Sequence, residues 1–157
     1  MKIFTIALLS MCLLLPGCAT TSGPKLTPLE IQSLQTREYE QKKDVVFPSV
    51  LSVFQDLGYI VKSADKETGL ITAEGAATSN AASKFWLGIT NVSQTSATAF
   101  VEEIGKLTKV RLNFVTSQTK SAAYGQTDRQ DQPILDAQIY NNAFERIENA
   151  IFVRASN

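Results

Sequence analysis

Apolar side chains recur at helical spacing in two stretches of the chain, and this pattern predicts two amphipathic helices. The first helix is expected over residues 44–57, and Gly58 directly after it marks the C-terminal end. Its apolar face consists of Phe47, Val50, Leu51, Phe54 and Leu57. The second helix is expected over residues 137–153, with Asp136 as its N-cap. Its apolar face consists of Tyr140, Phe144, Ile147 and Ile151.

Between the two helices, short runs rich in β-branched and aromatic residues predict strands. They cover residues 59–63, 69–73, 96–104 and 107–116, and short turns join them into two hairpins. In the last run apolar and polar side chains alternate, which is typical of a half-buried strand. A further strand over residues 34–40, polar on one face, is expected at an edge of the sheet. Residues 117–133 are polar and are expected to form a long loop.

The order of these elements is strand, helix, four strands and helix (β-α-β-β-β-β-α). Two amphipathic helices need an apolar surface to cover, and an antiparallel sheet with one apolar face provides it. We therefore expect an α+β fold of two layers, an antiparallel β-sheet packed by two amphipathic helices. A chain of 157 residues suits one such domain, which we expect over residues 32–157.

The N-terminus combines a basic start with a short apolar run, as secretory signal peptides do. Lys2 supplies the positive charge, and the apolar run after it is too short to span a bilayer as a helix. Leu15-Pro16-Gly17-Cys18 resembles the lipobox of bacterial lipoproteins. The resemblance implies cleavage between Gly17 and Cys18, which makes residues 1–17 the signal peptide. It also implies diacylglycerol on the cysteine thiol and a further acyl chain, such as palmitate, on its amino group. The alternative is an ordinary signal peptide with Cys18 as a bystander.

Lipid on Cys18 would hold the mature chain at a membrane, because burial of acyl chains contributes roughly 0.8 kcal/mol per CH₂. Ala19 stands where inner-membrane lipoproteins of proteobacteria tend to carry Asp. The resemblance therefore implies localisation on the periplasmic face of the outer membrane. Ser, Thr, Gly and Pro dominate the residues that follow, so residues 18–31 are expected to form the lipidated cysteine and a flexible tether.

Two segments of the chain resemble a largely uncharacterised family of small bacterial outer-membrane lipoproteins. The first is residues 37–73, in which FQDLGY ends a helix and GLITA forms a strand. The second is the closing helix within residues 133–152, with Tyr140, Phe144 and Phe152 at matching places. The resemblance implies a fold and a location more than an activity. More distantly, the layout is similar to the helix-grip domains of the lipoprotein component C of the outer-membrane β-barrel assembly machinery.

The residue content argues against an enzyme. The chain has no histidine, which excludes Ser-His and Cys-His nucleophile pairs and imidazole metal sites. Glu102 and Glu103 are neighbours on a predicted strand, so they point to opposite faces of the sheet. Asp128, Asp131 and Asp136 lack the spacing of a calcium loop. With 15 basic and 15 acidic side chains, the chain has no global field that would attract nucleic acid. We expect no catalysis, metal, cofactor or nucleic-acid partner.

Phe85, Trp86 and Leu87 interrupt a segment of small residues and form the candidate contact with a partner. Tryptophan is enriched at protein interfaces and at membrane surfaces. The alternative is that these side chains fold back and plug an end of the sheet, which the rarity of large exposed apolar patches favours.

Two functions of different classes follow. The first is a non-catalytic, membrane-anchored envelope lipoprotein, an accessory protein that binds another envelope component. Its contact is the 85–87 segment or the edge strand at residues 34–40, which can accept a strand from a partner. The alternative is a small periplasmic ligand-binding protein, with an apolar pocket between the sheet and the 79–93 segment. An enzyme acting through loop carboxylates comes third.

Overall fold

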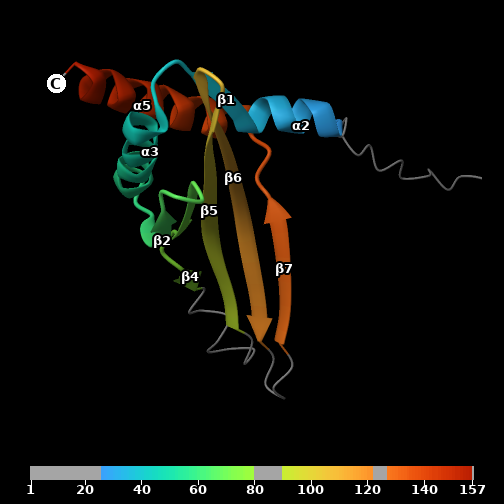
Figure 1. The fold of residues 1–157 in the computed structure, drawn as a ribbon. Helices are drawn as coiled ribbons and strands as arrows, with labels where there is room; N and C mark the ends of the chain where they lie inside the picture. Colours follow the sequence, from blue (N-terminus) through green and yellow to red (C-terminus); the bar gives the residue numbers. More distant parts are fainter. Residues whose placement is uncertain (1–25, 80–89, 122–126, 157) are drawn as a thin grey trace, which may run out of the picture.

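The computed structural model describes residues 26–79, 90–121 and 127–156. It has an α+β fold in which helices pack on an open antiparallel sheet of seven strands (Figure 1). The helices are α2 (Pro28–Gln35), α3 (Lys43–Asp56) and α5 (Ala137–Ala155). The strands are β1 (Thr36–Tyr39), β2 (Ile60–Asp65), β3 (Leu70–Glu74), β4 (Thr78–Ser79), β5 (Thr90–Ile104), β6 (Leu107–Ser121) and β7 (Thr127–Pro133). The two-layer α+β prediction is confirmed.

The sheet is built around one long hairpin. β5 and β6 have 15 residues each and pair along their whole length. The other edge of β5 carries β3, which in turn pairs with β2, and further along it carries the short strand β4. The other edge of β6 carries β1 beside residues 108–111 and β7 beside residues 115–121. Both predicted hairpins are therefore present, and β1 lies at an edge as expected.

The hydrophobic core lies between one face of the sheet and the helices α3 and α5, which also contact each other. The alternating residues of β6 that were predicted to face inward, Val110, Leu112 and Phe114, are buried. The closing helix buries the whole of its predicted apolar face, and α3 buries Phe47, Val50 and Phe54. Apolar periodicity thus identified the side chains that hold the two layers together.

Away from the helices, three strands continue as a narrow extension of the sheet (Figure 1). We call this extension the ribbon; it consists of residues 90–95 of β5, residues 115–121 of β6, and β7. In Figure 1 the ribbon runs away from all three helices. All seven residues of β7 are exposed.

Helix α2 corrects the predicted tether. Residues 28–31 were expected to be irregular, and the strand was expected from residue 34; instead the chain is helical to Gln35 and β1 begins at Thr36. The Thr27 N–H donates to Glu30 Oε2 at 2.7 Å, and the Glu30 N–H donates to Thr27 Oγ1 at 3.3 Å. This reciprocal capping box starts the helix. Pro28 is tolerated because the first helical position needs no N–H donor.

The predicted loop over residues 117–133 is also wrong. β6 continues to Ser121 and β7 begins at Thr127, and the two strands pair from Val115–Pro133 to Ser121–Thr127. Threonine, serine and glutamine dominate these strands, so no apolar alternation marks them in the sequence. They are strands because β5 extends the hydrogen-bonding template past the core.

Candidate functional site

The predicted lipidation and partner-contact residues are not among those that the structure describes. Gly17 and Cys18 lie before residue 26, and Phe85, Trp86 and Leu87 lie between residues 79 and 90. The described helices are all too short or too polar to cross a membrane.

The carboxylates considered in the sequence do not form a site. Asp128 and Asp131 lie on β7 rather than in a loop, and Asp136 caps α5 by accepting from the Gln138 N–H at 2.8 Å. Glu102 lies 3.9 Å from the Lys109 ammonium, whereas Glu103 accepts a bond from the Lys43 N–H at the start of α3. Within residues 26–79, 90–121 and 127–156, no group of three or more carboxylates or thiols can hold a metal ion.

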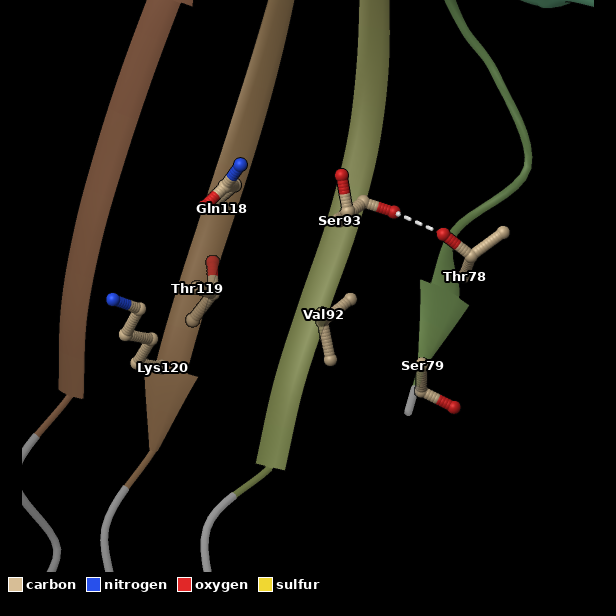
Figure 2. A pocket seen from close by; sticks show the side chains of 7 residues that line it. All are labelled: Thr78, Ser79, Val92, Ser93, Gln118, Thr119 and Lys120. Carbon is tan, nitrogen blue, oxygen red and sulfur yellow. Dashed lines mark hydrogen bonds between the residues drawn. The ribbon is translucent and has the colours of Figure 1, made fainter. Parts of the chain in front are cut away.

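A polar hollow of about 410 Å³ lies on the ribbon beside β4 (Figure 2). It is lined by Thr78, Ser79, Val92, Ser93, Gln118, Thr119 and Lys120. The Thr78 hydroxyl donates to the Ser93 carbonyl at 3.3 Å and so ties β4 to β5. Hydroxyl, amide and ammonium groups can hydrogen-bond a polyhydroxylated or anionic molecule. The apolar pocket expected between the sheet and the 79–93 segment stays a prediction, because most of that segment lies outside the described residues.

An apolar hollow of about 380 Å³ lies elsewhere, where α3 ends and α5 begins. Its lining is Leu57, Tyr59, Phe114, Ile139 and Ala143, with Asp136, Gln138 and Asn142 as polar members. The Tyr59 ring packs 5.9 Å from the Phe54 ring and 6.1 Å from the Phe114 ring, measured between centroids. Burial raises the pKa of the Tyr59 phenol, and Tyr140 adds to the effect. At neutral pH this hollow therefore offers apolar surface and a neutral phenol.

Comparison with solved structures gives distant likenesses only. No family model matches the sequence, and no curated protein matches it. The crystal structure of a DUF4468 family protein from Bacteroides ovatus is similar, with a TM-score of 0.39 and 8% identity. The match covers 84% of this chain and 91% of that protein. At this distance no conclusion about this chain follows from the likeness.

The exposed edge of β7 is the feature that the sequence interpretation missed. Arg129 and Asp131 lie on one face of this strand, with Arg129 Nε donating to Asp131 Oδ1 at 3.0 Å. Arg129 also donates to Ser117 Oγ on β6, at 3.2 Å. Hydrogen bonding to Asp131 from the Ser117 hydroxyl first, and then from Arg129, holds the pKa of the Asp131 carboxyl below its ordinary value. Residues 127–133 carry no apolar alternation that would have marked a strand in the sequence.

Proposed function

We propose that this chain is a non-catalytic lipoprotein of the bacterial envelope that binds another envelope component. The observation that carries the proposal is the ribbon, which extends beyond the helices and presents long strand edges (Figure 1). Exposed strand edges carry unpaired N–H and C=O groups and accept strands from partners. In the sequence, Phe85, Trp86 and Leu87 lie between β4 and β5.

The membrane anchor in this proposal is acylated Cys18, at the periplasmic face of the outer membrane. The lipobox resemblance supports it, and the described domain would reach the membrane only through the residues before Leu26. The test is a Cys18→Ala variant of the full chain, separated into membrane and soluble fractions. Release into the soluble fraction is expected. If the variant were cleaved after Gly17 and still stayed in the membrane fraction, the lipid anchor would be overturned.

Partner binding is tested by in-cell crosslinking of the tagged full chain, followed by mass spectrometry. A partner captured by the native chain is expected to be lost in the Phe85→Ser, Trp86→Ser variant. The matched control is Phe152→Ser, because Phe152 is an aromatic side chain 74% exposed on α5, far along the chain from this segment. Loss of the partner in the control as well, or no partner with the native chain, would count against the proposal.

A ligand-binding function is the second candidate, and the apolar hollow beside Tyr59 and Phe114 favours it. Pockets for small ligands are mostly apolar with a few polar groups, as this one is. An amphiphile such as a fatty acid should raise the melting temperature of the native chain. Ile139→Glu, which places a charge in the lining, should abolish the rise, whereas Phe152→Glu on the same helix should retain it. An equal rise in both variants would exclude this hollow.

A further inference from the structure

Among the described residues, the outer edge of β7 is an uncovered strand edge. β7 pairs with β6 on one side, and no other segment in the described part of the chain pairs with it on the other. Its seven residues are all exposed, and it contains one proline, at its last position. Seven residues of strand span roughly 23 Å, which is enough for a stable ladder with another strand.

The ribbon has little apolar surface of its own. Along residues 92–95, 115–121 and 127–133, the side chains without a polar group are Val92, Val115 and Pro133. Strands without an apolar face or a helix packed on them are marginally stable by themselves and depend on the backbone hydrogen bonds of their pairing. The pairing of a further strand with β7 would therefore stabilise the part of the fold that the core does not reach.

The hydrogen bonds around Phe114 show which backbone groups of β7 face outward. The Phe114 carbonyl accepts from the Ile134 N–H at 2.9 Å, so the backbone of Phe114 faces the β7 side. Directions alternate along an antiparallel strand, so residues 116, 118 and 120 of β6 face β7 and bond to residues 132, 130 and 128. The backbone groups of the odd-numbered residues of β7, Thr127, Arg129, Asp131 and Pro133, therefore point away from the sheet, and Pro133 offers only its carbonyl.

A second copy of β7 complements this edge in one register. An antiparallel pair with two-fold symmetry about Gln130 sets Arg129 opposite Asp131 of the partner subunit, twice. Moving the register by one ladder step in either direction sets Arg129 opposite Arg129 of the partner subunit, or Asp131 opposite Asp131 of the partner subunit. Opposite charges across a strand pair are stabilising and like charges are destabilising. Charge therefore favours the register centred on Gln130 over its neighbours.

We propose that two copies of this chain associate through β7, antiparallel and centred on Gln130, so that the two ribbons form one continuous sheet. The contact is isologous, as in most symmetric dimers. The proposal goes beyond partner binding in the envelope and is independent of the lipid anchor.

A disulfide test follows from the two-fold axis. In the register centred on Gln130, this residue faces its own copy in a non-hydrogen-bonded pair, whose Cα atoms lie about 4.5 Å apart, within disulfide range. The purified full chain in mild detergent, carrying Gln130→Cys, should form a reducible dimer on mild oxidation. Gln132→Cys is the matched control, because it has the same exposure and the same face but would lie opposite Asp128 of the partner subunit. Equal dimer in both variants, or in neither, would overturn the proposal.

Charge reversal at residue 129 or 131, added to the Gln130→Cys variant, tests the register. Adding Arg129→Asp sets acid opposite acid, and adding Asp131→Arg sets base opposite base; each should lower dimer formation about tenfold. Mixing the two differently tagged variants restores both opposite-charge contacts in the heterodimer alone. A heterodimer in large excess over either homodimer is expected. A statistical mixture of the three species would rule out the Arg129–Asp131 register.

Discussion

The hydroxyl of Tyr140 accepts a hydrogen bond from the backbone N–H of Phe114 at 3.3 Å. Residues 112–114 of β6 lie between the part paired with β1 and the part paired with β7, and no described strand pairs with them on that edge, where the Phe114 carbonyl bonds to the Ile134 N–H just after β7. The same hydroxyl accepts from Gln35 Nε2 at 3.4 Å, and Gln35 Oε1 accepts from Arg111 at 3.2 Å. The Tyr140 side chain of α5 and the Gln35 side chain of α2 thus bond to β6 at the gap between β1 and β7. These bonds connect the core to the ribbon.

Removal of this hydroxyl should destabilise the fold. Tyr140→Phe leaves the Phe114 N–H without the acceptor that Tyr140 supplies, and leaves the Gln35 amide with its contact to Asn113 Oδ1 at 3.5 Å. A buried donor without a partner costs about 1–3 kcal/mol, and we expect a loss of this size in the free energy of unfolding. Urea denaturation of the variant measures it.

Tyr39→Phe is the control for that experiment. The Tyr39 hydroxyl is buried and has no hydrogen-bond partner among the described residues. Its burial raises the pKa of the phenol, and Glu148 adds to the effect. Removing this hydroxyl should leave the unfolding free energy within about 0.5 kcal/mol of the native value. A Tyr39→Phe loss as large as that of Tyr140→Phe would show that the hydrogen bonds of Tyr140 do not explain its effect.

Gly69 should tolerate substitution less well than Gly58. Both have positive φ, +81° and +84°, which costs an L side chain about 1–2 kcal/mol. At Gly69 a Cβ atom would also lie 2.0 Å from the Val101 carbonyl oxygen, whereas at Gly58 nothing lies within 4 Å. We expect a loss of about 1–2 kcal/mol for Gly58→Ala and about 2–5 kcal/mol for Gly69→Ala, because the β3–β5 contact must also move. Equal losses in thermal unfolding would contradict this assignment.

Arg37 should not be replaceable by lysine. Its guanidinium lies 4.9 Å from the centroid of the Phe144 ring, donates to Asn141 Oδ1 at 3.2 Å, and donates to the Ser33 carbonyl at 3.0 Å. It therefore connects α2, β1 and α5. Lysine cannot make these contacts together, since it lacks the planar fork of donors. We expect Arg37→Lys to lower the unfolding free energy by about 1–2 kcal/mol.

The control for Arg37 is Arg146→Lys on the exposed side of α5. Arg146 donates only to Asn142, one turn away on the same helix, at 2.9 Å. Its replacement should change the unfolding free energy by less than about 0.5 kcal/mol. The prediction for Arg37 fails if the two variants lose the same amount.

The sequence predicted the parts of the fold that bury apolar side chains. Periodicity places Phe54 and Tyr140 on the correct helix faces, and Leu112 and Phe114 on the inner face of β6, because burial imposes the spacing. It could not predict β7, whose residues are all exposed and whose strand conformation depends on pairing with β6. The short helix α2 was missed for a related reason. Pro28 suggests irregular structure, and the signal from Thr27 and Glu30 is a single capping box.

The candidate sites show the same division. The sequence could exclude histidine chemistry, because the chain contains no histidine. It could also exclude a site formed by Glu102 and Glu103 together, because neighbouring residues of a strand point to opposite faces of the sheet. It could not find the apolar hollow, since Tyr59 and Ile139 come from opposite halves of the chain and meet only through packing. Nor could it find the edge formed by Arg129 and Asp131, because that edge requires the direction of each backbone group.

The capping box of α2 should open on acidification. Hydrogen bonds from the Thr27 backbone and side chain lower the pKa of the Glu30 carboxyl from its ordinary 4.5. A lowered folded-state pKa means that the contribution to stability is complete above pH 4.5 and is lost as the pH falls through the lower folded value. The amide resonance of Thr27, followed by NMR from pH 6 to pH 2, should report that loss with a midpoint below about 4.5. Glu30→Gln retains a capping-box acceptor that does not titrate. In that variant the Thr27 resonance should stay constant over the same range; a shift equal to that of the native chain would assign the titration to another group.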